Sequence, residues 1–376
     1  MSRVLAISSY KIFPPQSGGR RAIVFFHKYF SKEEDEILVG TKNNDSSNTL
    51  GIRVVNVFGT SKFRYINLLS FFKLRSIARK NKIETVIVEH PYMGVFGIML
   101  KFFCRKKLII RSHNIEGLRF KELGKWWWKW LYAFEKKMHQ SADFSFFITK
   151  EDEDFALKNF HLKKEKTAVI TYGTELDSPL HAEEKQEAVV RLKQSFGIPQ
   201  EQTVLLFNGV FGYKPNDEAL YLLVKKIMPL LLRKDDSFTL LVFGKNIPEE
   251  VKNYSSKNIL VKGFADDIDA VFKGAEIFLN PIWLGGGIKT KLVEALSLGA
   301  SAVSFESGAI GVDKNVAGEK LLIAEDENVE DFVEKIIRQK QTVSLQTPET
   351  FYRHFYWGNI AKRAAQCFSN VGSILI

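Results

Sequence analysis

Cysteine is scarce in this chain, and so are the signals of export and membrane insertion. Cys104 and Cys367 stand far apart, which excludes a disulfide framework and any metal spacing between them. The opening residues, MSRVLAISSY, lack the apolar core and the cleavage site of a signal peptide. The longest apolar run, GVFGIML at 94–100, is far shorter than the roughly 20 residues of a membrane-spanning helix. We therefore expect a cytoplasmic protein in a reducing compartment.

Acidic residues are also few in the first half of the chain. Residues 1–176 hold 31 Lys and Arg against 17 Asp and Glu, a balance of +14, whereas the remainder has 23 against 26, a balance of −3. Such asymmetry favours an anionic partner for the first half, with random variation of surface charge as the alternative. Composition alone leaves lipid, nucleic acid and acidic glycan open as partners. Because no recognised nucleic-acid motif is present, we expect no nucleic-acid partner.

Short apolar runs alternate with helical patterns along the whole chain, which predicts strands buried on both faces of parallel sheets. In the first half these runs are residues 4–8, 36–40, 53–58, 85–90, 107–112, 144–149 and 167–171. In the second half they are residues 203–208, 238–244, 258–263, 276–281, 300–305 and 320–325.

A polar stretch after Asp177 separates the two series. The pattern predicts an α/β protein with two Rossmann-like, doubly wound parallel-sheet domains, 1–176 and 177–356. A last helix, at about 357–376, is expected to pack back on the first domain. Ligands bind beyond the carboxyl ends of such strands, so we expect the two domains to face each other across a cleft.

The most informative segment begins where a strand ends at Asn280. Three consecutive glycines, Gly285 to Gly287, precede a helix that is expected to begin near Lys289. Glycines let the backbone approach a phosphate closely, and the free N–H groups at a helix start point at it. Lys289 and Lys291 add positive charge, and Glu294 is placed to accept hydrogen bonds from ribose hydroxyls. The alternative is a tight turn with solvent-exposed lysines.

This segment resembles the donor-site signature of GT-B glycosyltransferases of glycosyltransferase family 4, also called glycosyl transferases group 1. The family pattern G-x-G-[TI]-[RK]-x-K-x-x-E-A is matched from Gly285 to Ala295. Other segments resemble the family in the expected order: residues 205–220, 240–246 and 261–281, and in the first half 14–20 and 111–117. The resemblance implies a retaining enzyme that moves a hexose from a nucleotide-sugar to a glycan or lipid-linked acceptor, in cell-surface polysaccharide synthesis.

The resemblance also implies roles for the matched residues. Glu294 would hold the ribose of the donor, Lys214 and Lys291 would meet the diphosphate, and His113 would contact the transferred sugar. Backbone groups around Gly263 and Phe264 would meet the base. The other expected donor-binding residues are Gly209, Gly285, Gly286, Gly287, Ile288, Lys289, Thr290 and Leu292.

This sequence departs from the family at two positions and offers no metal motif in a plausible donor loop. Many members carry two glutamates seven residues apart, and the first would fall at Gly286. Lys289 stands where arginine is more usual, giving a point charge in place of a bidentate fork. Asp266 and Asp267 precede a predicted helix and are expected to cap it. We therefore expect no cofactor and no essential metal, since the nucleotide-sugar is a substrate.

Several residues of the first half can each be interpreted in two ways. Gly18 and Gly19 form either an acceptor or phosphate loop or a simple turn. His113, directly after an apolar strand, is either a sugar contact or a structural histidine. His90, at the end of another strand, either lines the same cleft as His113 or lies outside it.

Two segments mix lysine with aromatic residues, at 62–82 and 121–139. On a helix, Trp127 and Trp130 would share a face that packs on the sheet. Lys121, Lys125 and Lys129 would share another, beside further tryptophans, as at a lipid headgroup interface. We expect the first domain to associate peripherally with the inner face of the cell membrane; core packing of these aromatics is the alternative.

Two other functions remain open at this point. A nucleotide-sugar epimerase of the same fold would need no basic amphipathic face. A non-catalytic nucleotide-sugar binding module is disfavoured by the intact set of Lys214, Lys289, Lys291 and Glu294.

Overall fold

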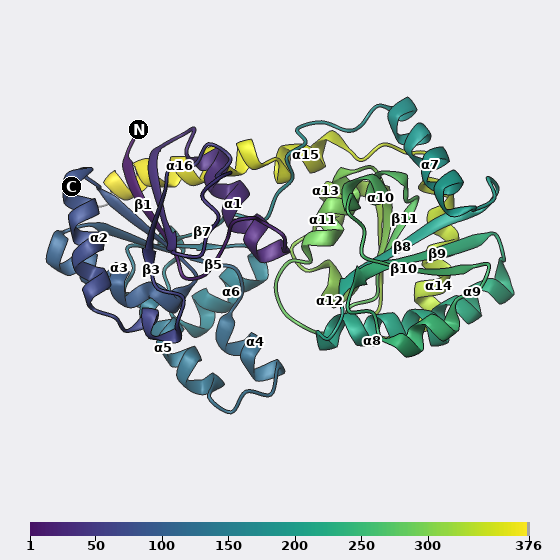
Figure 1. Ribbon diagram of the computed structural model, residues 1–376, viewed down its shortest axis with the longest axis horizontal. Coiled ribbons are helices and arrows are strands. Elements are labelled where there is room, and N and C mark those ends of the chain that lie inside the picture. The colour runs from purple at the N-terminus through teal and green to yellow at the C-terminus, as the bar shows by residue number, and fades with distance from the viewer. Residues whose placement is uncertain (374–376) are drawn as a thin grey trace. The chain divides into compact units, whose positions relative to one another are not determined.

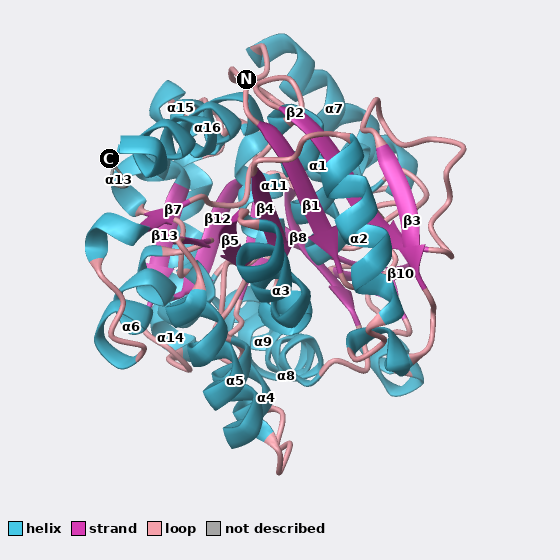
Figure 2. Ribbon diagram, turned by 90° about the vertical axis from the view of Figure 1, so that its left-hand side faces the viewer, coloured by secondary structure: helices cyan, strands magenta, loops and turns pink. Residues whose placement is uncertain are grey.

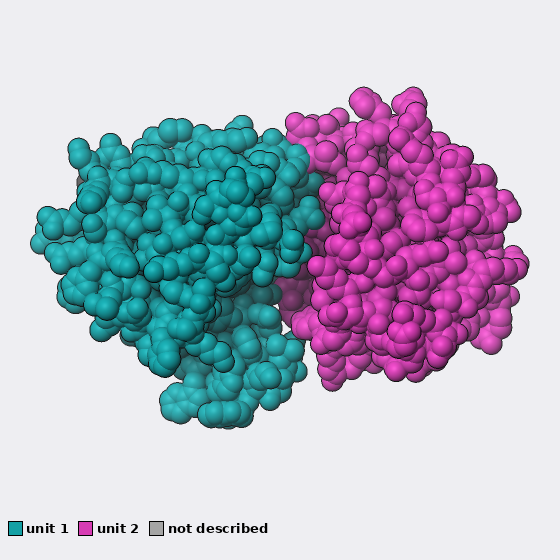
Figure 3. Space-filling model, viewed as in Figure 1, with its two compact units in different colours: residues 1–175, 355–376 teal, residues 176–354 magenta. Residues whose placement is uncertain are grey.

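The computed structural model describes the backbone of residues 1–373 and the side chains as far as Phe368. The described chain forms two compact units, each built on one parallel sheet (Figures 1 and 3). Unit 1 holds Met1–Glu175 and the segment that starts at Phe355, and unit 2 holds Leu176–His354. Both units are Rossmann-like α/β structures, which confirms the predicted fold class.

The sheet of unit 1 has the strand order β3-β2-β1-β4-β5-β6-β7, with every pairing parallel. Its strands are β1 (Arg3–Ser8), β2 (Asp35–Thr41), β3 (Val54–Phe58), β4 (Thr85–Glu89), β5 (Lys107–Ser112), β6 (Phe144–Phe147) and β7 (Thr167–Val169). The order of strands reverses between β1 and β4. The carboxyl ends of these two strands therefore form the switch point at which ligands of such sheets bind.

Helices α2 and α3 cover one face of this sheet, where Phe71, Leu74 and Phe96 pack on apolar strand residues (Figure 2). The last helix lies along α1, and the rings of Phe30 and Phe368 are 5.4 Å apart there (Figure 1). The helices of unit 1 are α1 (Gly18–Phe30), α2 (Leu69–Lys80), α3 (Gly94–Cys104), α4 (Glu116–Glu122), α5 (Trp128–Ser141), α6 (Lys150–Asn159) and α16 (Trp357–Ser373).

The prediction that Trp130 packs on the sheet is wrong. Its side chain is 77% exposed, and the buried residues of α5 are Glu135, Met138 and His139. The carboxylate of Glu135 accepts hydrogen bonds from the backbone N–H groups of Glu116 and Gly117, at 3.0 and 2.9 Å. Because this contact caps the start of α4, it sets the buried face of α5 and turns Trp130 outward.

The sheet of unit 2 has the order β10-β9-β8-β11-β12-β13, again with parallel pairings, and its switch point lies between β8 and β11. Its strands are β8 (Thr203–Val210), β9 (Phe238–Lys245), β10 (Ile259–Gly263), β11 (Ile277–Asn280), β12 (Ser301–Phe305) and β13 (Leu321–Ala324).

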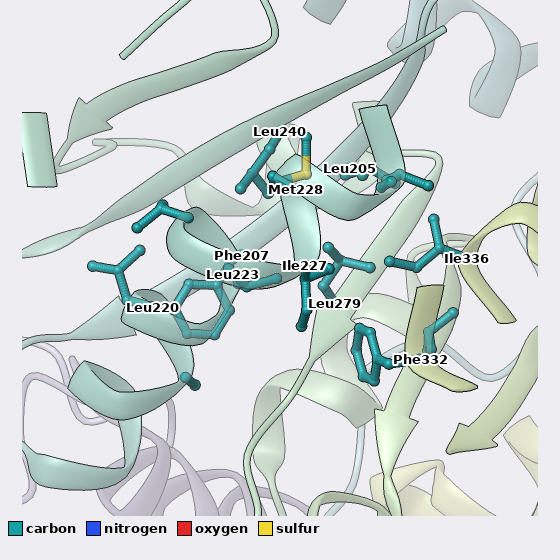
Figure 4. Packing of buried hydrophobic residues seen from close by; sticks show 14 of the residues in the cluster. Leu205, Phe207, Leu220, Leu223, Ile227, Met228, Leu240, Leu279, Phe332 and Ile336 are labelled. Atoms are coloured by element: carbon teal, nitrogen blue, oxygen red, sulfur yellow. The ribbon is translucent and has the colours of Figure 1, made fainter. Parts of the chain in front are cut away.

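The core of unit 2 is apolar on the face that α8, α9 and α14 cover. Figure 4 shows Phe207 and Leu279 of the strands beside Ile227, Phe332 and Ile336 of the helices. A π-helical turn at Leu223–Ile227 joins α8 to α9. The helices are α7 (Ala182–Phe196), α8 (Lys214–Leu222), α9 (Met228–Lys234), α10 (Ile268–Gly274), α11 (Thr290–Ser297), α12 (Glu306–Ala309), α13 (Lys314–Ala317), α14 (Val329–Gln339) and α15 (Glu349–Phe355).

Candidate functional site

The glycine loop of unit 2 connects β11 to α11. Gly285 (φ 82°) and Gly287 (φ 70°) lie in the left-handed region that favours glycine, so the loop depends on them. Helix α11 begins at Thr290, and its N-cap residue, Lys289, makes no capping hydrogen bond with its side chain. Since the first N–H groups of a helix have no partner within it, the loop and the helix start form a site suited to an anion.

The two lysines of this segment point at backbone oxygens. The ammonium group of Lys289 donates to the carbonyls of Gly285 and Gly287, at 2.5 and 3.1 Å. That of Lys291 donates to the carbonyl of Asn208, at 2.5 Å. Burial lowers the pKa of Lys291 to about 8, against the opposing effect of the Glu294 carboxylate. Lys291 is therefore still largely cationic at neutral pH, and its charge is sensitive to small rises in pH.

The start of α8 lies beside the same loop. A Cβ atom added to Gly285 would lie 3.2 Å from the hydroxyl of Tyr213 and 3.6 Å from Pro215. Lys214, between these two residues, is exposed, and its ammonium group is 3.5 Å from the Glu218 carboxylate. Gly209 lies near the end of β8, close to Gly244 of β9. A Cβ atom added to Gly244 would lie 2.0 Å from the carbonyl oxygen of Gly209.

The predicted donor residues of unit 2 therefore gather at its switch point. Strands β8 and β11 are neighbours, and α8 and α11 both begin at their carboxyl edge. Two helix N-termini with Lys214, Lys289 and Lys291 form a cationic site of the kind that binds a diphosphate. The side chain of Leu292 is fully buried in the core, so only its backbone is available to a ligand. Ile288 and Thr290 are half-buried.

The segment predicted to meet the base lies at the same sheet edge. Gly263 (φ 81°) ends β10, and the ring of Phe264 is 61% exposed, with the ammonium group of Lys245 4.5 Å from its centre. Strand β10 is separated from β8 by β9 alone, which places Gly263 about 10 Å from the β8 edge. The position of the missing family glutamate, Gly286, is exposed, and a Cβ added there meets no atom within 4 Å.

In unit 1 the structure joins His113, His90 and the Gly18–Gly19 segment. The imidazoles of His90 and His113 stack with their centres 4.1 Å apart. The hydroxyl of Tyr10 is 3.0 Å from Nε2 of His90, and a Cβ on Gly19 would lie 3.8 Å from that hydroxyl. Gly18 and Gly19 open α1. All of these groups lie at or near the switch point between β1 and β4.

Behind His113 lies a set of buried polar residues that were not predicted from the sequence: Glu89, Arg111, His27 and Glu36. Glu89 ends β4 and Arg111 is the penultimate residue of β5, and both are fully buried. A charged residue inside an otherwise apolar strand is the signal that could have found them, because such strands are covered on both faces.

Three remaining expectations concern metal, capping and membrane spans. Among the described residues, no three His, Cys, Asp or Glu side chains are arranged to hold a metal ion. The carboxylate of Asp267 accepts a hydrogen bond from the N–H of Ala270, at 3.0 Å, and caps α10 as predicted. No helix in the described part of the chain has both the length and the apolar character to cross a bilayer.

Comparison with protein families gives two matches, one in each unit. Residues 202–340 match the model of "Glycosyl transferases group 1", and residues 17–178 match that of "Glycosyltransferase Family 4".

Comparisons with individual proteins and with solved structures agree with these matches. An uncharacterized 44.6 kDa protein in the cps region of Klebsiella pneumoniae is 23% identical, over 92% of both chains. A UDP-Gal:alpha-D-GlcNAc-diphosphoundecaprenol alpha-1,3-galactosyltransferase of Escherichia coli is 21% identical, over 80% of this chain and 79% of the relative. Sucrose-phosphate synthase of Thermosynechococcus elongatus superposes with a TM-score of 0.73 at 14% identity, covering 100% of both chains. Anabaena HepE in complex with UDP gives 0.67 at 13%, covering 100% of this chain and 98% of that one.

Proposed function

This chain is a GT-B glycosyltransferase of the family 4 type, and from that premise we propose that it transfers a hexose from a nucleotide-sugar to a glycan or lipid-linked acceptor. We further propose retention of anomeric configuration and a place in cell-surface polysaccharide synthesis. The names of two relatives support this: one is encoded in a cps region, and the other acts on a sugar-diphosphoundecaprenol.

One observation carries the donor site: the convergence of two helix N-termini at the switch point of unit 2. Lys291 of α11 contacts Asn208 of β8, and Gly285 of the glycine loop lies beside Tyr213 and Pro215, where a Cβ atom added to it would meet both residues at the start of α8. In our proposal the diphosphate of the donor occupies this junction, Glu294 accepts hydrogen bonds from the ribose, and Phe264 lies beside the base.

This arrangement suits the departure of a nucleoside diphosphate. As the bond between the anomeric carbon and the phosphate oxygen breaks, negative charge grows on the leaving group. In our proposal Lys214, Lys291 and the N–H groups of α11 meet that charge. The contact with Asn208 holds Lys291 in place beforehand, and such preorganised donors stabilise a transition state without reorganisation. We propose on this ground that the reaction requires no metal ion.

The proposal is tested by incubating the full chain with a panel of nucleotide-sugars and a lipid-diphosphate acceptor that bears one sugar. Mass spectrometry of the acceptor should show the gain of one hexose with one donor of the panel. Lys291→Met should abolish most of this activity, whereas Lys226→Met, an exposed lysine of unit 2 outside the site, should retain it. Donor epimerised without an acceptor, or bound but never consumed, would contradict transfer.

We also propose that unit 1 docks on an anionic membrane surface. Seven large apolar side chains lie exposed on the 3-10 turn Lys62–Tyr65, on α2 and its N-terminal approach, and at the end of α3. This α2–α3 apolar patch consists of Phe63, Ile66, Leu68, Leu69, Phe72, Phe102 and Phe103. The rings of Phe72 and Phe103 both lie next to Phe71, at 5.7 and 6.1 Å, which joins the two helices.

The charge around this patch supports a membrane as its partner. Residues 59–107 hold 11 Lys and Arg against two acidic residues, Glu84 and Glu89, and Glu89 is buried. Exposed Phe and Leu among basic residues fit the boundary between headgroups and acyl chains. Trp126 and Trp130 are 83% and 77% exposed. They lie among the lysines of the α4–α5 segment and form a second exposed aromatic surface for the membrane.

A further inference from the structure

Glu89 stands at the centre of a buried network in unit 1. Its carboxylate lies 3.0 and 3.1 Å from the guanidinium of Arg111, 3.0 Å from Nε2 of His27 and 2.6 Å from Nε2 of His113. Glu89, Arg111 and His27 are fully buried, and His113 is 7% exposed. The Glu89 carboxylate, at the end of β4, thus contacts the nitrogen atoms of three side chains, and of these three only His113 is partly exposed to solvent.

The network keeps Glu89 ionised. Burial alone would protonate the carboxyl, but Arg111, followed by the hydrogen bonds from His113 and His27, holds the pKa of Glu89 well below its usual range. Burial likewise disfavours a charged His27, yet the carboxylates of Glu36 and Glu89 raise its pKa to about 9. At neutral pH two cations, Arg111 and His27, therefore face the Glu89 carboxylate, whereas burial raises the pKa of Glu36 on the far side of His27.

His113 is neutral in this setting. Burial and the nearby charges of His90 and Arg111 lower its pKa to about 3, although the hydrogen bond to Glu89 acts in the opposite direction. A neutral imidazole has one N–H donor and one acceptor nitrogen.

The contacts of Nε2 decide which nitrogen of His113 holds the proton. Nε2 lies 2.6 Å from the Glu89 carboxylate, which can only accept, and 3.2 Å from the Arg111 guanidinium, which can only donate. A lone pair held 2.6 Å from an ionised carboxylate would be repelled, so the shorter contact requires an N–H at Nε2. Nδ1 is then the acceptor, and it has no hydrogen-bond partner among the described residues.

The ring of His113 is also fixed in orientation. His90 stacks on it at 4.1 Å, with 25° between the planes, and His90 is itself held by the Tyr10 hydroxyl at 3.0 Å. His90 adopts φ 61° and ψ 154°, a backbone conformation that is nearly restricted to glycine. Such strain persists only where the surrounding structure imposes it. The packing around His90 therefore holds its ring in the stack with His113.

We propose that Glu89 is a positioning residue: it fixes His113 as the neutral Nε2–H tautomer, so that Nδ1 accepts a hydrogen bond from a hydroxyl of the transferred sugar. The proposal rests on the proposed function and on the contact with the transferred sugar that the family resemblance implies for His113. It predicts discrimination at that hydroxyl, because a deoxy sugar cannot donate to Nδ1 and leaves it unpaired.

The tautomer is measurable in the wild-type full chain without substrate. With ¹⁵N-labelled histidine, long-range ¹H–¹⁵N correlation should show His113 protonated at Nε2 and not at Nδ1, with no titration between about pH 8 and 5. The His113→Asn spectrum identifies its signals, and His139, buried between the hydroxyls of Ser112 and Ser145, serves as an internal reference. A proton on Nδ1, or titration in this range, would overturn the proposal.

Kinetics test whether Glu89 acts through His113. We expect Glu89→Gln to lower kcat about tenfold, the effect of losing one hydrogen bond, with donor KM little changed. In a His113→Ala background the same change should have no further effect on kcat, because coupled residues are not additive. Equal losses in both backgrounds would show that Glu89 does not act through His113.

A matched control separates this role from the loss of a buried charge. Glu153→Gln changes a fully buried carboxyl group of unit 1 that pairs with Lys164 and Thr167, outside the Glu89 network, so it should lower stability without lowering kcat. If wild-type protein transfers no sugar with any donor, the proposed function fails while the NMR result stands. If wild type is active and folded Glu89→Gln matches it, the positioning role fails alone.

Discussion

The ammonium group of Lys291 donates a hydrogen bond to the backbone carbonyl of Asn208, 2.5 Å away. This contact joins the first turn of α11 to the end of β8, across the switch point of unit 2. It fixes a cation next to the glycine loop before any ligand binds. A preorganised charge of this kind costs little further ordering when an anion arrives.

Nucleotide affinity should fall as pH rises above neutrality. Burial lowers the pKa of Lys291 to about 8, so the ammonium is charged below this pH and neutral above it. An anionic ligand binds the charged form, and affinity for a nucleoside diphosphate should therefore decrease between about pH 7 and 9.5. Calorimetry measures this, in a range where the last ionisation of the phosphate, near pH 6, is complete. Lys291→Arg should remove the decrease, and a decrease of equal size in that variant would exclude Lys291 as its source.

Glu294→Ala should weaken donor binding and leave the fold intact, because the Glu294 side chain is only half-buried on α11. Losing hydrogen bonds to a charged acceptor costs about 1.5–3 kcal/mol, roughly a ten- to hundredfold loss of affinity. Glu334→Ala, at an exposed residue of α14, is the matched control. Unchanged affinity in folded Glu294→Ala protein would remove Glu294 from the site.

Activity should survive chelation of divalent metals. The proposed site meets the diphosphate with Lys214, Lys291 and two helix N-termini, which do the work that Mg²⁺ performs elsewhere. Turnover in excess EDTA should match turnover in buffer. Loss of turnover with EDTA and its recovery with Mg²⁺ would show that these groups do not suffice.

Unit 1 should carry the chain to anionic vesicles. Each basic residue near such a surface contributes about 1 kcal/mol, and inserted aromatics add an apolar term that salt does not screen. Co-sedimentation should be stronger with anionic than with neutral liposomes, and weaker at high salt. Changing Lys121, Lys125 and Lys129 together to Glu should reduce it.

Separate variants locate the docking surface. Phe72→Ser with Phe103→Ser, on the α2–α3 apolar patch, should reduce the binding that remains at high salt. Lys225→Glu with Lys226→Glu, on unit 2, should not affect binding. Equal binding to both liposome types, or none to either, would favour an acceptor in solution.

Much of the fold could be predicted because the strands are continuous apolar runs. Each run read as a strand forms one, as Thr85–Glu89 and Lys107–Ser112 illustrate, since burial on both faces leaves no room for a polar alternation. The start of α11 next to Lys289 was also predictable, because three glycines before an amphipathic pattern determine where the helix begins.

The buried network could not be predicted in the same way. Glu89 and Arg111 lie 22 residues apart on consecutive strands, and only the register of β4 with β5 places them opposite each other. The exposed Trp130 has a similar cause, because the buried face of α5 depends on Glu135 reaching a neighbouring helix. Helical periodicity alone contains no information about such tertiary contacts.

The anomeric configuration of the product is the most direct measure of whether this chain is a retaining glycosyltransferase. Wild-type protein is incubated with acceptor and with the active nucleotide-sugar, labelled with ¹³C at the anomeric carbon. We predict that NMR will show the labelled carbon in a new glycosidic bond to the acceptor, with the configuration it had in the donor. A product of inverted configuration would contradict retention. Labelled free sugar or an epimerised donor, with the acceptor unchanged, would contradict transfer itself.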